Sequence, residues 1–127
     1  MKLKLELSRR AAWIIFAILV LLLVAGTTMP NELKAEIEGR MWRKLPWSAL
    51  AHYTLFMLLG MCPVYGNGRA AALRTIGVAV MLAVITETLQ SVVPGRHPQM
   101  KDMAIDIAGT ATALFLRRVL PPVRISS

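Results

Sequence analysis

The sequence predicts an all-α integral membrane protein: a four-helix bundle with a short interfacial helix in its first outer loop. Apolar residues make up 56% of the 127 residues and charged residues only 17%, and the apolar residues form long blocks. The formal net charge is +8, and the Lys and Arg residues flank these blocks. Flanking cations orient membrane helices and contact anionic lipids, so membrane lipids are expected partners and nucleic acid is not. We expect residues 1–127 to form a single domain.

The first predicted crossing covers residues 11–29. Ala11 to Gly26 is a run of 16 residues without a polar side chain, and extension to Met29 gives 19. Such a helix is about 28 Å long, close to the thickness of the hydrocarbon core. A secretory signal peptide is the rival interpretation, because the run contains a small residue, Ala25, at its end. Its length and the apolar helices that follow favour a crossing.

A polar connector follows, and it contains a helical pattern. Leu33, Ile37, Met41 and Leu45 recur at four-residue spacing, with Trp42 and Trp47 nearby. This pattern predicts a short helix that lies in the membrane interface with its tryptophans at headgroup depth.

Three more crossings are predicted over residues 45–64, 75–93 and 102–120. Turn signals separate them, a Gly-Asn-Gly sequence at 66–68 and a Pro-Gly-Arg-His-Pro sequence at 94–98. The last crossing is rich in small residues, which permit close helix packing inside a bundle: Ala104, Ala108, Gly109, Ala111 and Ala113.

The distribution of positive charge orients the four crossings. With the N-terminus inside, nine of the 15 Lys and Arg residues fall on inner segments and six on outer segments. Inner loops of membrane proteins carry the excess of Lys and Arg. We therefore expect a multi-pass protein with both termini in the cytoplasm.

This orientation gathers polar side chains at the outer face. Glu87 and Gln90 are i and i+3 on one helix, and Asp102 and Asp106 are i and i+4 on the next, so each pair shares a helix face. Carboxylates at membrane depth point into the bundle and find partners. The candidate ligand-binding residues of this predicted polar pocket are His52, Glu87, Gln90, Arg96, Lys101, Asp102 and Asp106.

Three interpretations of the cluster stay open. Glu87, Arg96 and Asp102 could form an ion-pair network that only fixes the tight outer loop. The cluster could instead bind a lipid headgroup. A metal site is the third, but no pair of metal-binding residues stands at ligand spacing on one helix, so we expect no metal and no cofactor.

The spacing of these residues matches a known pattern. Glu87, Gln90, Arg96, Asp102, Asp106 and Gly109 follow E-x-x-Q, five residues, R, five residues, D, three residues, N, two residues, G. The segment from His52 to Gly60 is similar to H-F-x-x-Y-x-x-L-G, although Ser48 and Ala49 replace the preceding Asp and Lys. Over about 27–109 the chain thus resembles the VanZ-like family, from which it departs at Asp106, where the family usually has Asn.

The resemblance implies a small multi-pass protein of the bacterial plasma membrane. The name-giving member is linked to resistance to teicoplanin, a glycopeptide antibiotic that carries a lipid tail. Some relatives carry a phosphotransbutyrylase label, but this chain has no coenzyme A or phosphate-binding motif to support that activity.

Two main functions are compatible with this sequence. The protein could bind a lipid headgroup, a lipid-linked envelope precursor or a partner protein. Arg96 and Lys101 would then contact phosphate, and this binding would lower teicoplanin susceptibility. Alternatively, it could be an intramembrane enzyme acting on a lipid-linked substrate, with Glu87 or Asp102 as general base and His52 as acid or orienter. No nucleophile–base pair is visible, which favours binding over catalysis.

A third possibility is a scaffold subunit of an envelope polysaccharide assembly system. The small residues of the last crossing would then form the interface of a homo-oligomer.

Overall fold

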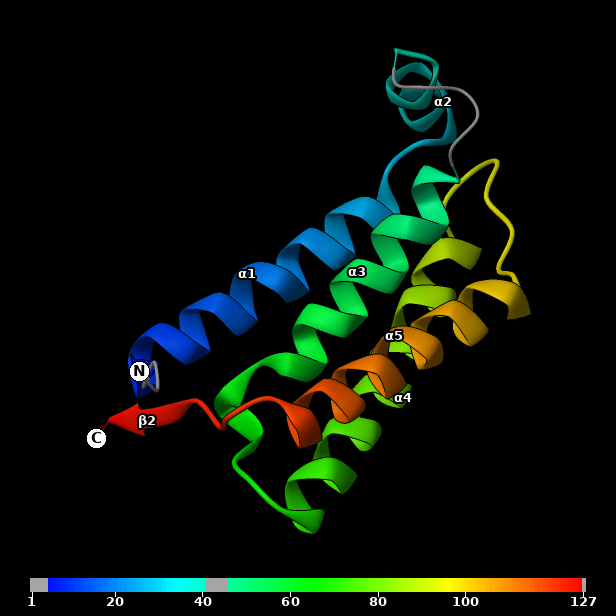
Figure 1. Ribbon diagram of the computed structural model, residues 1–127. Coiled ribbons are helices and arrows are strands. Elements are labelled where there is room, and N and C mark those ends of the chain that lie inside the picture. The colour runs from blue at the N-terminus through cyan, green and yellow to red at the C-terminus, as the bar shows by residue number, and fades with distance from the viewer. Residues whose placement is uncertain (1–4, 41–45, 127) are drawn as a thin grey trace.

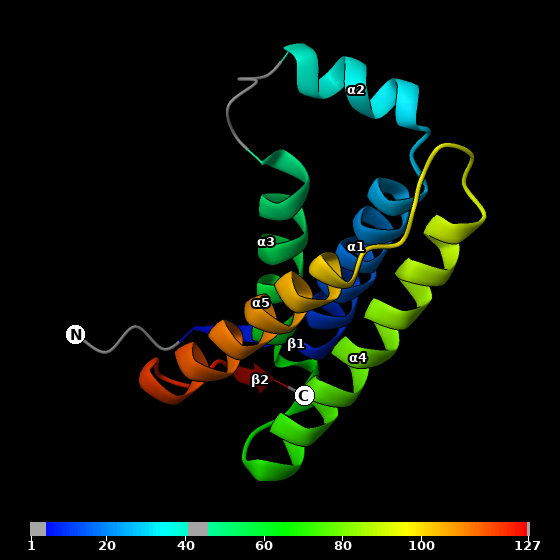
Figure 2. The same ribbon diagram turned by 90° about the vertical axis from the view of Figure 1, so that its right-hand side faces the viewer.

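The computed structural model describes residues 5–40 and 46–126. The longer helices lie along one another as a bundle, and a shorter helix, α2, lies across one end of it (Figures 1 and 2). The helices are α1 (Arg9–Thr28), α2 (Asn31–Arg40), α3 (Trp47–Met61), α4 (Arg69–Ser91) and α5 (Met100–Val119). A 3-10 turn, η1 (Pro63–Tyr65), follows α3, and two short strands, β1 (Glu6–Ser8) and β2 (Arg124–Ser126), flank the bundle helices.

Helix α1 agrees with the predicted crossing at 11–29 to within two residues. The Ser8 hydroxyl accepts a hydrogen bond from the Ala11 amide at 3.1 Å and caps the helix start. Met29 has an extended backbone (ψ 130°), because the residue before a proline avoids the helical region. Pro30 thus ends α1 at the end of its apolar run.

Helix α3 is shorter than the predicted crossing at 45–64. It has 15 residues, which is about 22 Å of helix. Cys62 precedes Pro63 and is extended (ψ 129°), so the helix ends at Met61 and the chain continues as η1. Leu45, the predicted start, lies outside the described residues.

Helix α4 starts six residues before the predicted position, Thr75. Its first turns contain three alanines and Leu73, which are strong helix formers, between Arg69 and Arg74. The two arginines lower the hydropathy of this segment but do not interrupt a helix. The crossing predicted from the apolar run is therefore shorter than the helix at its N-terminal end. Helix α5 agrees with the prediction of 102–120 to within two residues.

The described residues are mostly helical, as predicted, and two three-residue strands are the addition that the prediction did not include. They pair in parallel, with Glu6 opposite Arg124 and Ser8 opposite Ser126. The amide of Arg124 also donates to the carbonyl oxygen of Leu5 at 3.2 Å. This pairing holds the two terminal segments together at the end of the bundle opposite α2, which we name the terminal end (Figure 1). The other end, with α2 and the 92–99 loop, is the α2 end.

The helix predicted in the connector forms as α2. Leu33 and Ile37 keep 46% and 40% of their surface exposed, so α2 presents apolar side chains outward at the α2 end. The predicted pattern also included Met41, Trp42 and Leu45, which lie outside the described residues. Trp47 belongs to the first turn of α3 rather than to α2.

Helices α3 and α5 make the most extensive contact in the bundle. A Cβ atom at Gly109 would lie 2.5 Å from the carbonyl oxygen of Tyr53, and one at Gly60 would lie 2.6 Å from the Ala113 Cβ. Small residues therefore let the two backbones approach closely. Only part of the predicted small-residue set serves this contact, because Ala104, Ala108 and Ala111 are exposed.

The bundle buries several polar side chains and exposes many large apolar ones. Buried polar residues include Thr27, His52, Thr75, Thr86, Gln90, Asp106 and Thr110. Exposed residues include Trp13, Ile14, Leu21, Leu22, Leu73, Met81 and Phe115, each more than half exposed. Such apolar surface is unfavourable in water and suits contact with lipid.

Two of the described helices, α1 and α4, are long and apolar enough to span a membrane, and α3 is a shorter apolar helix. Only 22% and 28% of the apolar windows of α1 and α4 are buried, whereas the core helix of a soluble protein would be mostly buried. These two helices therefore have membrane-helix character.

Candidate functional site

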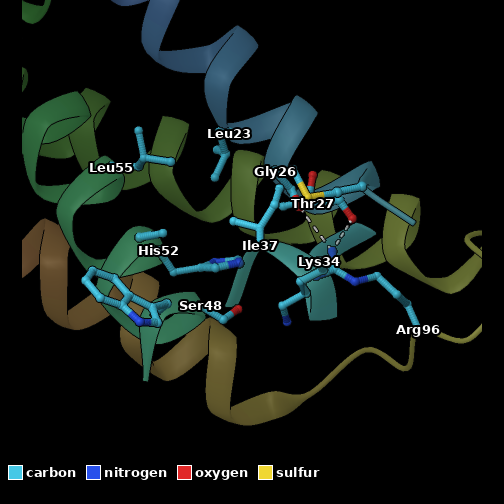
Figure 3. A pocket seen from close by; sticks show the side chains of 12 residues that line it. Leu23, Gly26, Thr27, Lys34, Ile37, Ser48, His52, Leu55 and Arg96 are labelled. Carbon is cyan, nitrogen blue, oxygen red and sulfur yellow. Dashed lines mark hydrogen bonds between the residues drawn. The ribbon is translucent and has the colours of Figure 1, made fainter. Parts of the chain in front are cut away.

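A pocket of about 170 Å³ opens at the α2 end (Figure 3). It is formed by the last turns of α1, by α2, by the first half of α3 and by the loop before α5. Its walls are largely apolar, with Leu23, Ile37 and Leu55 among the lining residues. Two cationic side chains, Lys34 and Arg96, also line it. The pocket thus combines an apolar interior with positive charge.

Arg96 is held in place by the C-terminal end of α1. One terminal nitrogen of its guanidinium donates to the carbonyl oxygens of Gly26 and Thr27, at 3.1 and 2.7 Å. The last carbonyls of a helix lack intrahelical partners and carry partial negative charge, so a cation there is favourable. Gly95 has a positive φ of 76°, which turns the chain immediately before Arg96. The result is a link across 69 residues of sequence that closes one side of the pocket.

His52 lies between the pocket and the interior of the bundle. Its Nδ1 is 2.8 Å from Oδ1 of Asp106, and both side chains are buried. An ionised carboxylate only accepts hydrogen bonds, so with Asp106 ionised the Nδ1 carries the proton that is shared. The imidazole ring points into the pocket in Figure 3. The pair therefore joins α3 to α5 and leaves Nε2 as the ring nitrogen that is not bound to Asp106.

The ion-pair network of Glu87, Arg96 and Asp102, one of the three interpretations of the cluster, does not form. Within residues 5–40 and 46–126, these three side chains make no ion pair with one another within 4.0 Å. Arg96 turns toward α1 instead, because the helix carbonyls offer it short hydrogen bonds. Asp102 lies in the first turn of α5, where the helix dipole favours an acidic residue.

Glu87 lies on α4 facing the same region of the bundle as the His52–Asp106 pair. It is half-buried, and its Oε1 atom is buried without a hydrogen-bond partner. Asp106 likewise has one buried oxygen, Oδ2, without a partner. Asp102, Asp106 and His52 lie near enough to Glu87 to act on it electrostatically. In the part of the chain that is described, no group of three or more His, Cys, Asp and Glu residues could hold a metal ion.

The structure divides the predicted site residues into three groups. His52 and Arg96 line the pocket, and Asp106 contacts it only through His52. Glu87, Gln90 and Asp102 do not line the pocket, and Gln90 is buried inside the bundle. Lys101 is exposed at the start of α5 and does not line the pocket either.

Lys34 was not among the predicted site residues, although it lines the pocket together with Ile37. The two residues are i and i+3 on α2, so they share one face of that helix. This spacing was a signal available in the sequence. The position of α2 over the end of α1 and α3 was not, because a connector of this length can fold in either direction.

Comparison with known proteins places the chain in a family. The model of the VanZ/LLP1 family matches residues 5–121, which is nearly the whole chain. The protein belongs to the VanZ/LLP1 family. No curated protein and no solved structure matches it.

Membership in the VanZ/LLP1 family agrees with the membrane character of the apolar helices. The residues that carry the resemblance have distinct structural positions here. Gly60 and Gly109 allow the close approach of α3 and α5, His52 and Asp106 join those helices, and Arg96 binds the end of α1. In this VanZ/LLP1 chain the motif therefore includes contacts that connect three bundle helices at and beside the pocket.

We expect Arg96→Gln to lower the stability of the protein by about 1–2 kcal/mol, because two charge-assisted hydrogen bonds to α1 are lost at a half-buried position. Thermal unfolding in detergent would measure the change. Lys101→Gln is the matched control, since it removes an exposed cation at the same end of the bundle. Equal unfolding temperatures for the two variants would contradict a structural role for Arg96.

Proposed function

We propose that this VanZ/LLP1 protein crosses the bacterial plasma membrane four times, with α1, α3, α4 and α5 as crossings and with the α2 end outside. The bundle has lipid-compatible apolar surface on α1 and α4. Its two terminal segments pair with each other, which requires an even number of crossings for a membrane-spanning chain. The positive-inside bias supports placing both termini in the cytoplasm.

We further propose that the pocket binds the phosphate-bearing headgroup of an envelope lipid or lipid-linked precursor, and that this binding lowers susceptibility to a lipid-tailed glycopeptide. The observation that carries the proposal is the presence of Lys34 and Arg96 in the lining of a largely apolar pocket at the α2 end, the end that the proposed topology puts among the outer headgroups. Such a pocket suits an amphiphile, because the cations attract phosphate and the apolar wall accepts part of its chain.

Arg96 is suited to this role by its orientation. The hydrogen bonds to Gly26 and Thr27 use one terminal nitrogen of the guanidinium. A guanidinium has five N–H donors in a planar fork, so others stay available for phosphate oxygens. Lys34, which lines the same pocket from α2, supplies a second positive charge (Figure 3). Lys34 therefore takes the phosphate-binding role that the sequence had suggested for Lys101.

We expect Lys34→Gln to abolish protection against teicoplanin in a glycopeptide-sensitive Gram-positive host that expresses the protein. The wild-type chain and Lys101→Gln should both protect, because Lys101 is a cation at the same end that does not line the pocket. Immunoblots of membranes establish equal abundance, and vancomycin, which lacks the lipid tail, serves as the comparison antibiotic. Equal protection by both variants would rule out a role for the pocket. Absence of protection by the wild type would rule out the glycopeptide part of the proposal.

Catalysis is a second candidate, which the His52–Asp106 pair favours. A histidine whose Nδ1 is bound to a buried carboxylate and whose ring faces a pocket has the arrangement of an oriented general base. In this arrangement Asp106 orients the histidine, and His52 takes the role of general base that the sequence had suggested for Glu87 or Asp102. Turnover of a labelled polyprenyl-phosphate substrate by the wild type, lost in His52→Gln and reduced in Asp106→Asn, would support catalysis. Unchanged substrate with all three proteins would exclude this reaction.

A further inference from the structure

A second pocket, of about 310 Å³, lies at the terminal end, between the start of α4 and the end of α5. Its polar lining includes three arginines, Arg69, Arg117 and Arg118, and its apolar lining includes Ile76 and Leu114. The pocket lies at the opposite end of the bundle from α2, as Figure 1 shows for the elements that form it. We propose that this pocket binds the phosphate headgroup of an anionic phospholipid of the inner leaflet.

Arg117 is built into this site by neutral partners. One terminal nitrogen donates to the Thr75 hydroxyl at 2.8 Å and to the Gly60 carbonyl at 3.3 Å, and the other donates to the Gly66 carbonyl at 2.7 Å. Its guanidinium also lies over the ring of Tyr65, 5.9 Å from the centroid. These contacts fix the direction of the side chain without neutralising its charge.

Tyr65 does not supply the missing negative charge. Burial raises the pKa of its phenol to about 12, so the ring stays neutral at physiological pH. Few acidic side chains are described at the terminal end. Arginines described there are Arg9, Arg10, Arg69, Arg74, Arg117, Arg118 and Arg124, whereas Glu6 is the acidic residue in the same described segments. The three pocket arginines form no ion pair with any described carboxylate within 4.0 Å. An anionic ligand would therefore find positive charge that no described carboxylate neutralises.

The start of α4 adds to the attraction for an anion. Gly68 precedes the helix with a φ of 88° and provides no side-chain cap, and the first intrahelical bond from this turn is donated by Ala72. The amides of residues 69–71 thus have no helical acceptor, and they lie at the positive end of a 23-residue helix. Beside three arginines, these amides strengthen a site for phosphate oxygens.

The apolar part of the lining identifies the ligand as a lipid rather than a soluble phosphate. Ile76 is 44% exposed, and Leu73, one turn earlier on α4, is 70% exposed. Both residues continue the outward apolar surface of α4 away from the arginines. A phospholipid can place its phosphate among the arginines and its acyl chains along this surface. Basic pockets between membrane helices on the cytoplasmic side bind anionic headgroups in this way.

The test is thermal unfolding of the purified full chain in detergent, with added phosphatidylglycerol, phosphatidylcholine or free glycerol phosphate. We expect phosphatidylglycerol to raise the unfolding temperature more than the other two, because only it combines net negative charge with acyl chains. The Arg69→Gln/Arg118→Gln double variant should lose more than half of that shift. Both side chains are exposed, so the double variant should still fold.

Arg124→Gln is the matched control, since Arg124 is an exposed arginine at the same end that does not line the pocket. It should retain the full shift. An equal shift in the double variant and in Arg124→Gln would overturn the proposal. Equal stabilisation by glycerol phosphate and by phosphatidylglycerol would overturn the assignment to a lipid.

Discussion

Replacement of Gly109 by alanine should destabilise the bundle by about 2–3 kcal/mol or more, as expected for overpacking of a tight contact. The added Cβ would lie 2.5 Å from the Tyr53 carbonyl oxygen and 3.2 Å from the Met57 amide nitrogen. Both are backbone atoms of α3, so no side chain can rotate to relieve the overlap. The helices α3 and α5 would have to separate, which weakens the largest contact in the bundle.

Gly77→Ala is the control for this prediction. Gly77 is also a glycine within a bundle helix, but a Cβ atom there would have no neighbour within 4 Å. Since alanine favours helix over glycine by about 1 kcal/mol, this variant should be as stable as the wild type or slightly more stable. Circular dichroism during thermal unfolding in detergent measures both. If Gly109→Ala unfolds at the wild-type temperature, the close contact of α3 and α5 is wrong.

Removal of the Asp106 carboxylate should have an effect of similar size. In Asp106→Ala, the buried Nδ1 of His52 loses its partner at 2.8 Å. An unpaired polar group in the interior lowers stability by about 1–3 kcal/mol, and more where the lost partner is charged. We expect a loss of about 2–4 kcal/mol and reduced amounts of protein in membranes.

Asp106→Asn should keep most of the stability that Asp106→Ala loses. The amide oxygen of asparagine can accept the hydrogen bond from His52, and the VanZ-like pattern usually has Asn at this position. The unfolding temperatures of the two variants, measured under the same conditions, show whether the hydrogen bond or the charge of Asp106 provides the stability. Equal losses in both would mean that the charge of Asp106, and not the hydrogen bond, holds α3 to α5.

The sequence predicted the helices that a continuous apolar run determines. The run from Ala11 to Met29 fixed α1, and Pro30 marked its end. The predicted start of α4 was too late, because the first turns of this helix contain arginines and have low hydropathy. The predicted end of α3 was also too late, because Pro63 ends the helix through its effect on the backbone of Cys62 and not through a change in hydropathy. The β1–β2 pairing escaped prediction, since it joins three-residue segments from the two ends of the chain.

The candidate site was predictable in its residue types but not in its contacts. The order of the predicted crossings put His52, Arg96 and Asp106 at one end of the bundle, and the structure places His52 and Arg96 in one pocket there with Asp106 bound to His52. Charge complementarity suggested a partner of Arg96 among the carboxylates. The structure pairs it instead with the carbonyl end of α1, a partner that a list of charged residues does not contain. Lys34 was missed for a similar reason, because its place in the site depends on how α2 folds back.

The orientation of the bundle in the membrane is the central claim, because both proposed lipid sites depend on it. Single cysteines placed by Leu33→Cys and His97→Cys at the α2 end, and by Asn67→Cys and Ser126→Cys at the terminal end, test it in a Cys62→Ser background. All four positions are exposed. With a membrane-impermeant maleimide on intact cells, we expect labelling at positions 33 and 97, and labelling at 67 and 126 only after permeabilisation. The reverse pattern, or equal labelling of all four positions in intact cells, would contradict the account.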